Sequence, residues 1–376
     1  MIAIIIFLLI LNVLIIVHEL GHYILAKRVG VEVKEFAIGL GPAIFQKEWN
    51  NTVWKINIFP IGGYNALKGE SESEGGKGNF ATARKRDKLQ VLFAGSLMNF
   101  LLAIVAFYIM MPFFNWQVPA MIEFQPVGGK LTTVGKLTEG PIIYEVSDNS
   151  SLKNESITFP VELVSVSGEK VSSTEDAIVK ITSHAKEGNT SVELELRDLN
   201  SQEVKSYTAS YFDSNKIGIT IADTQDTYAI DYGENLATKA FSGFSHSINI
   251  VKVTGTFFYR MVAYVNTTKD FSPVSQTVSG PVGVYAVVDD IVASSGAMLR
   301  DLGHLTGLIS LNLAIFNLLP FPGLDGWHIL IVALEKVRKK KFNENTLGII
   351  SLIGLGLLLA FSFLITIKDV FLYIIK

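Results

Sequence analysis

Two histidines and a glutamate lie close together near the start of the chain, in the segment His18-Glu19-Leu20-Gly21-His22. Residues four apart project from the same face of an α-helix, so both imidazoles can bind one metal ion. The glutamate between them is placed to take a proton from a water held by that ion. We therefore predict that His18 and His22 are metal ligands and that Glu19 is a general base.

The surroundings of this segment favour the metal-binding interpretation. Residues 2–17 are apolar except for Asn12, and the histidines continue the same predicted helix. Ionisable groups at membrane depth are energetically expensive and usually functional. The alternative is a chance match at a helix end, or histidines satisfied within a protein core. The chain has no cysteine, so only His, Asp and Glu remain as candidate ligands.

Long apolar stretches predict a polytopic α-helical membrane protein with about four transmembrane helices. The composition agrees, because 49% of the 376 residues are hydrophobic. Pro320 and Pro322 interrupt the third stretch. The start of the chain lacks a basic region and a small-residue cleavage site, so we interpret it as a retained anchor and not as a signal peptide. The predicted spans cover about residues 2–26, 89–114, 305–319 and 347–367.

The charges of the connecting segments predict how the chain is oriented in the membrane. Residues 27–90 carry eleven Lys/Arg against seven Asp/Glu, whereas residues 115–234 carry nine against nineteen. By the positive-inside rule, the first segment and the basic loop at 336–341 face the cytoplasm, and the acidic segment lies outside. The first and third spans then both run inward, so their far ends lie in the cytoplasmic third of the membrane.

A two-histidine site needs a further protein ligand, and Asp325 in Leu324-Asp325-Gly326 is the candidate. At about 1.5 Å per residue, His18 lies about 24 Å along the first span and Asp325 about 30 Å along the third. The alternative for Asp325 is a turn or N-cap role, which is common in Asp-Gly. The similar depth and the missing ligand favour a metal site of two histidines and a carboxylate with one open position.

The acidic segment 115–234 reads as a soluble α+β module. Residues 161–166 and 192–197 alternate in polarity as strands do, and residues 174–181 predict a helix. Residues 241–265 predict an amphipathic helix on the outer membrane surface, with a fifth span as the alternative. The predicted domains are therefore 1–114, 115–234, 235–302 and 303–376.

On these residues the chain resembles the site-2 protease family of intramembrane zinc metalloproteases, in its bacterial regulator-of-sigma protease branch. The resemblance covers nearly the whole length. The acidic module lies where the family carries PDZ domains, and it has room for one. Ser96 departs from the Ala-Gly-Pro that the family usually has in its second span. Besides the His-Glu-Leu-Gly-His block, the matching segments are Asn317-Leu318-Leu319-Pro320, Leu324-Asp325-Gly326, Phe59-Pro60-Ile61-Gly62-Gly63-Tyr64 with Gly69-Glu70, Ala94-Gly95-Ser96 with Asn99, and Gly280-Pro281-Val282-Gly283.

The resemblance implies a zinc metalloendopeptidase that cleaves transmembrane segments of single-span substrates near the cytoplasmic side, in regulated intramembrane proteolysis. His18, His22 and Asp325 would hold Zn²⁺. The expected partners are anti-sigma factors or signal-peptide remnants, together with membrane lipid, and a net charge of −3 suggests no nucleic-acid partner. The expected location is the bacterial cell membrane, with a membrane-associated β-hairpin loop and an extracytoplasmic PDZ-like domain.

Substrate contacts are predicted in two kinds of place. The stretch 56–64 offers an edge strand with which an extended substrate can pair. Two asparagines of the predicted spans are candidate amide partners for the substrate backbone, and the alternative for each is a helix–helix contact. The residues predicted to contact substrate are Ile61, Gly62, Gly63, Tyr64, Asn99 and Asn317.

Two other functions fit parts of this pattern. A tethered protease acting on soluble peptides requires the helix with the histidines to lie outside the lipid, which the apolar run disfavours. A membrane scaffold that keeps a metal ion for stability has no need of Glu19, which is present.

Overall fold

The computed structural model describes residues 2–69, 78–120, 124–136, 138–147, 149–155, 157, 159–199, 201–212, 216–222, 226–269, 279–294 and 296–373. Glu70, which belongs to one of the matching sequence segments, lies outside these residues. The chain forms two compact units. One consists of Met1–Gln117, Pro126–Gly129 and Tyr232–Lys376, and the other of Val118–Gln125 and Lys130–Asp231.

Three helices of the described chain are long and apolar enough to cross a membrane, namely Ile2–Arg28, Lys85–Phe114 and Asn345–Phe371. They coincide with the first, second and fourth predicted spans. The first is α1 (Ile2–Arg28). The second joins α2 (Lys85–Met110) to a 3₁₀ turn, η1 (Met111–Phe114). The third lies within α10 (Glu344–Tyr373).

The third predicted span corresponds to α8 (Met298–Asn317), which is not one of those three helices. Its first turn carries Asp301 beside Arg300, so the apolar part is short. The count of four spans therefore stays a prediction. α8 ends at Asn317, and the two prolines fall in the connection to α9 (Asp325–Arg338), as the missing N–H of proline requires.

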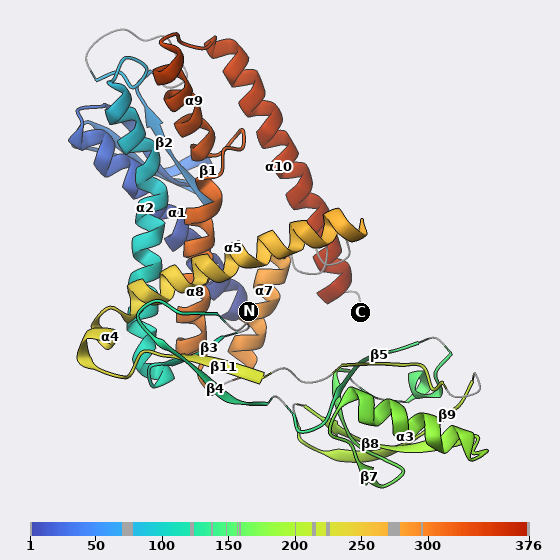
Figure 1. Ribbon diagram of the computed structural model, residues 1–376. Helices are drawn as coiled ribbons and strands as arrows, with labels where there is room; N and C mark the ends of the chain where they lie inside the picture. Colours follow the sequence, from blue (N-terminus) through green and yellow to red (C-terminus); the bar gives the residue numbers. More distant parts are fainter. Residues whose placement is uncertain are drawn as a thin grey trace. The chain divides into compact units, whose positions relative to one another are not determined.

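Several helices of the first unit pack against α2. α2 contacts α1, α8 and α9, and Figure 1 shows α1, α2 and α8 running side by side. Gly326, directly after Asp325, is needed for the sharp return into α9, because a Cβ there would clash with the carbonyl oxygens of Leu318 and Leu319. This packing brings the start of α9 close to the last turns of α1.

Between α1 and α2 the chain forms a sheet of two long, bent strands, β1 (Val33–Trp49) and β2 (Thr52–Leu67). Residues 35–38 of β1 pair twice, once with 53–56 and once with 63–66. The final part of β2 is therefore an edge, and no other strand of the described residues pairs with it. β2 also contacts α1, so this edge lies along the helix that carries the histidines.

The described residues of the first unit include three further helices, α4 (Leu236–Ala240), α5 (Ser242–Thr268) and α7 (Pro281–Ala293). The predicted amphipathic segment 241–265 corresponds to α5, which has buried polar residues near its start and exposed Phe257, Tyr259 and Val262 further along. α7 begins in the Gly280-Pro281-Val282-Gly283 segment. The buried carboxylate of Asp369 in α10 accepts hydrogen bonds there from the N–H groups of Gly280 and Gly283, at 2.7 and 3.0 Å.

The second unit is an α+β module. One sheet has the strand order β10-β5-β6-β8-β9 with β7 beside β6, and a smaller sheet has the order β3-β11-β4. The strands predicted at 161–166 and 192–197 are β6 and β8, and the predicted helix is α3 (Thr174–Lys186), which buries Ala177 and Ile181 against the larger sheet. The assignment to the PDZ class stays a prediction. The strands are β3 (Gln117–Ala120), β4 (Lys130–Lys136), β5 (Ile142–Val146), β6 (Val161–Val166), β7 (Glu169–Lys170), β8 (Ser191–Asp198), β9 (Val204–Ser210), β10 (Ile219–Ala222) and β11 (Asp226–Asp231), with a 3₁₀ turn, η2 (Ser151–Asn154).

Candidate metal centre and active site

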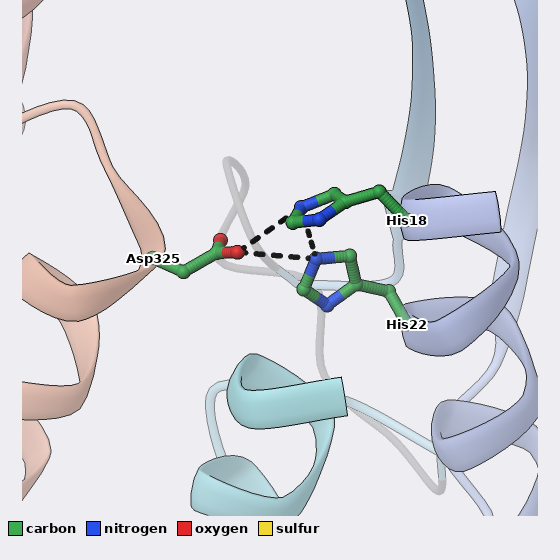
Figure 2. A group of neighbouring side chains, drawn as sticks. All are labelled: His18, His22 and Asp325. Atoms are coloured by element: carbon green, nitrogen blue, oxygen red, sulfur yellow. Dashed lines mark hydrogen bonds and ion pairs between the residues drawn. The ribbon is translucent and has the colours of Figure 1, made fainter. Parts of the chain in front are cut away.

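The structure brings His18, His22 and Asp325 together, although Asp325 lies about three hundred residues after the two histidines in sequence. Figure 2 shows both imidazoles projecting from α1 toward the Asp325 carboxylate, which comes from the first residue of α9. The Nε2 atoms of the histidines are 3.1 Å apart. Asp325 Oδ2 lies 3.2 Å from His18 Nε2 and 3.3 Å from His22 Nε2. Asp325 is the first residue of α9, and its side chain also contacts both histidines. A position at the start of a helix and a place beside the histidines are thus compatible.

The residues present fit a zinc ion. Two imidazole nitrogens and one carboxylate oxygen are a ligand set that zinc accepts in catalytic sites. Ligand atoms about 2.0–2.1 Å from a tetrahedral zinc are about 3.3–3.4 Å from each other, close to the three distances above. Gly95 of α2 leaves the space beside the ring nitrogens open, because a Cβ at this position would lie 2.7 Å from His18 Nε2 and closer still to His22 Nε2.

Groups behind the histidines hold the rings with Nε2 directed at Asp325. His22 Nδ1 lies 2.8 Å from the carbonyl oxygen of Val91, so the Nδ1–H donates to the backbone and Nε2 keeps its lone pair for a metal. The side-chain amide of Asn99 lies 3.4 Å from His18 Nδ1. Asn99 is 1% exposed, and its backbone carbonyl accepts a hydrogen bond from Ser310 of α8. The structure thus places Asn99 behind a histidine; its predicted contact with substrate stays a prediction.

Glu19 lies beside the three-residue group without belonging to it. Among the described residues, the ligand-type atoms that lie within 4.8 Å of one another come from His18, His22 and Asp325. The Glu19 carboxylate instead accepts a hydrogen bond of 2.7 Å from the side-chain amide of Asn65 in β2. Glu19 is half-buried and one residue from His18, which suits a group that exchanges protons and does not bind the metal.

The predicted substrate strand runs past Glu19 at the edge of the sheet. A Cβ at Gly63 would lie 3.7 Å from the Glu19 Cγ atom, and the Ile61 side chain is 51% exposed. The Tyr64 hydroxyl donates to Glu35 Oε2 at 3.0 Å. A hydrogen bond from Lys55 lowers the pKa of the Glu35 carboxyl, so that this acceptor stays ionised and keeps Tyr64 in place.

Asn317 is the last residue of α8, eight residues before the start of α9 at Asp325, and its side chain is half-buried. The structure gives it no place in the His18, His22 and Asp325 group. Its predicted contact with a substrate backbone stays a prediction.

Sequence reasoning missed three groups that support this site. Asn65 is a polar residue in the apolar end of β2, which is visible in the sequence. The sequence does not indicate that its partner is Glu19, 46 residues away. The Val91 contact is made by a backbone carbonyl, which every residue has, so the residue type does not reveal it. Gly95 was noted as part of a matching segment, but its reason, the space beside the two histidines, appears only when α1 and α2 are packed together.

A His-Glu-x-x-His helix that is apolar enough to cross a membrane, with a carboxylate from a second helix, defines a metalloprotease built within a membrane protein. The comparison with protein families agrees. The model of Peptidase family M50, the site-2 protease family, matches residues 6–361, and the chain belongs to this family.

Several curated bacterial proteins are similar to the chain over nearly its full length. A protein of Clostridium acetobutylicum, named as a candidate zinc metalloprotease, is 29% identical over 96% of this chain and 94% of its own. A protein of Fusobacterium nucleatum with a similar name is 29% identical over 96% of both chains. The regulator of sigma-W protease RasP of Bacillus subtilis is 25% identical over 98% of both chains. The chain is accordingly a zinc metalloprotease with membrane-embedded, apolar helices.

Proposed function

We propose that this protein is an endopeptidase that cuts the transmembrane segments of single-span membrane proteins. The observation that carries the proposal is the meeting of His18, His22 and Asp325, with Glu19 beside them, at the end of a helix long and apolar enough to cross a membrane. A protease of soluble peptides has no use for a site at that depth, because burying ionisable groups there is costly.

Each residue has a definite task in the proposed reaction. His18, His22 and Asp325 would hold a zinc ion, which would supply a Lewis acid for the scissile carbonyl and for the attacking water. Glu19 accepts the proton of that water and delivers it to the leaving amide nitrogen as the peptide bond breaks. The Val91 carbonyl accepts the Nδ1–H of His22 and so orients this ring, and an acceptor of this kind improves the geometry of a metal ligand. The Asn99 amide lies 3.4 Å from His18 Nδ1, on the side of the ring away from Asp325.

The substrate is proposed to reach Glu19 in an extended form. A transmembrane helix keeps its carbonyl groups in its own hydrogen-bond ladder, so it must unwind before a water can attack. The free edge of β2 at Ile61, Gly62, Gly63 and Tyr64 supports this step, since it offers unpaired backbone groups next to Glu19. Asn317 is proposed as an additional amide partner for the unwound backbone.

The proposed substrates are anti-sigma factors of single-span type and signal-peptide remnants. The similarity to a regulator of sigma-W protease supports the first class. The charge distribution supports a cytoplasmic-side active site and an extracytoplasmic PDZ-like module in a bacterial cell membrane. A single-span substrate would then be cut close to its cytoplasmic end.

Incubation of the purified protein with a panel of single-span anti-sigma factors and signal-peptide remnants, with and without a zinc chelator, tests the proposal. We expect cleavage within the apolar segment, its loss on chelation and its recovery when zinc is restored. Soluble peptides that lack an apolar segment serve as the control and should remain intact. Cleavage of soluble peptides at the same rate, or cleavage that a chelator does not affect, would contradict the proposal.

A further inference from the structure

The end of β2 is tied to α1 by two asparagine side chains, one at each end of the strand segment proposed to bind substrate. Asn12 Nδ2, in α1, donates to the Pro60 carbonyl at 2.6 Å. Asn65 Nδ2, in β2, donates to the backbone carbonyl of Glu19 at 2.6 Å. Residues 61–64 therefore lie between two points at which the strand is hydrogen-bonded to α1.

Asn65 makes a second contact that Asn12 does not make. Its Nδ2 atom also donates to Glu19 Oε2, at 2.7 Å. One amide group thus fixes both the backbone and the carboxylate of the same residue. Hydrogen bonds to ionised acceptors are stronger than those between neutral groups, so this contact restricts the rotation of the Glu19 side chain.

Attachment of the strand to the helix explains only one of the two hydrogen bonds that Asn65 donates to Glu19. The bond from Asn65 to the Glu19 backbone carbonyl is sufficient to hold the strand on the helix. The bond to Oε2 adds nothing to that attachment, but it determines where the carboxylate lies. The amide of Asn65 has no acidic or basic group of its own at neutral pH, so it can orient the base without competing with it for the proton.

We propose that Asn65 is the positioning residue for Glu19, and that it links the placement of the substrate strand to the alignment of the base. The inference rests on the proposed function. Substrate pairs at residues 61–64, and the next residue of the same strand holds the carboxylate that activates the water. Displacing the strand therefore displaces the base, and removing the amide of Asn65 frees the carboxylate of Glu19 as well as one attachment of the strand.

The test compares Asn65→Leu and the isosteric Asn65→Asp, both of which lack the donor, with Asn65→Gln, which retains it. We expect both donor-free variants to lower kcat about 10–100-fold, since a small misplacement of a catalytic group costs about that much, and to raise KM no more than Asn12→Leu, which also removes one attachment of the strand. Asn65→Gln should recover part of kcat. Zinc content should equal that of the wild type, and in a Glu19→Gln background Asn65→Leu should change the Kd for uncut substrate no more than Asn12→Leu does.

Two other side chains provide matched controls. Asn12→Leu removes the other attachment of the strand, at Pro60, and should mainly raise KM. Thr52→Val removes a buried side-chain donor from the same strand outside residues 56–64, where the hydroxyl donates to the Val33 carbonyl at 2.8 Å, and should leave kcat within about threefold, as expected for a site without contact to the base.

The outcomes separate this inference from the proposed function. If the wild type and Glu19→Gln cleave equally, the proposed function is wrong, whatever the Asn65 variants do. If the wild type cleaves and Asn65→Leu keeps its kcat, or loses kcat and zinc together, or loses no more kcat than Asn12→Leu or Thr52→Val, then Asn65 is only a structural contact and the inference is overturned.

Discussion

At the scale of single residues, the proposed metal centre depends as much on the absence of a side chain as on the proposed ligands themselves. Gly95 lies where α2 passes the two histidines, and any larger residue would occupy the space beside their Nε2 atoms. The placement of both histidines on one face of a helix was predictable from their spacing of four. The need for a glycine opposite them was not, because it depends on the distance between two helices.

Gly95→Ala is expected to lower zinc affinity and activity by at least about tenfold, comparable to the loss of an outer partner of a metal ligand. Alanine is the better helix former by about 0.5–1 kcal/mol, so the loss cannot come from a weakened helix. Zinc analysis of the purified protein checks the expectation. Gly356→Ala in α10, where a Cβ meets nothing within 4 Å, is the matched control and should bind zinc normally. Full zinc occupancy in Gly95→Ala would refute the assignment of this space to the metal.

Asp325→Ala is expected to lose both zinc and activity, because it leaves two histidines as the only protein ligands at the site. The cost in zinc affinity should exceed the about 10–100-fold that removal of an outer partner causes. Asp325→Glu retains a carboxylate on a longer arm and should keep part of the metal. Equilibrium dialysis against zinc buffers measures both variants. An Asp325→Ala variant with wild-type affinity and wild-type cleavage would show that Asp325 is a helix-start residue and not a ligand.

At the scale of secondary structure, the edge of β2 carries the proposed substrate site. Ile61 is absent from the paired register between β1 and β2, whereas Tyr64 pairs with Ala37. Proline at position 61 therefore removes an N–H from the edge with little disturbance of the sheet. Proline at position 64 would also disturb the pairing between β1 and β2.

Ile61→Pro is expected to reduce cleavage by about tenfold or more while zinc stays bound, since the lost donor weakens pairing with an extended substrate. Ile61→Ala keeps the N–H and removes most of the side chain, so it separates backbone pairing from side-chain contact and should retain more activity. Cleavage rate and zinc content are measured on the same preparations. Unchanged cleavage by Ile61→Pro would mean that this stretch is only a bend in the strand.

The helices and strands were more predictable than their contacts. Apolar stretches located α1, α2 and α10, and alternating polarity located β6 and β8, because both signals are local. Pro320 and Pro322 indicated the break before Asp325 for the same reason. The pairing of residues 35–38 with two segments of β2, and the bond from Asn65 to Glu19, join residues far apart in sequence, and nothing in the local pattern specifies them.

At the scale of the whole molecule, the second unit is an insertion whose ends lie together. Lys136 at the end of β4 pairs with Asp226 at the start of β11. The six-stranded sheet and α3 are therefore joined to the rest of the chain through one pair of neighbouring strands. The charge distribution of the sequence predicts that this module is extracytoplasmic and that the active site faces the cytoplasm, across a bilayer core about 30 Å thick. We therefore expect the module to affect access of substrates and not the chemistry.

Replacing residues 137–225 by an Asn-Gly turn is expected to leave cleavage of a substrate without an external domain intact, and to permit cleavage of one that still carries a bulky external domain. Asn-Gly suits a two-residue connection between paired antiparallel strands, so β4 and β11 can remain joined. Zinc content establishes first that the metal centre survives. A zinc-loaded deletion variant that still rejects the bulky substrate would place the size filter elsewhere, with α5 as the next candidate.

The central claim is that Glu19 acts as the base of a zinc centre formed by His18, His22 and Asp325, and Glu19→Gln tests it most directly. The variant keeps the size of the side chain and removes its ability to take a proton, so cleavage of a single-span substrate should fall by about 10²–10⁴-fold or to background. Zinc content, measured on the same sample, should equal that of the wild type. Loss of zinc together with activity would make Glu19 a ligand, and retained cleavage would show that the reaction does not use it; either result contradicts the account.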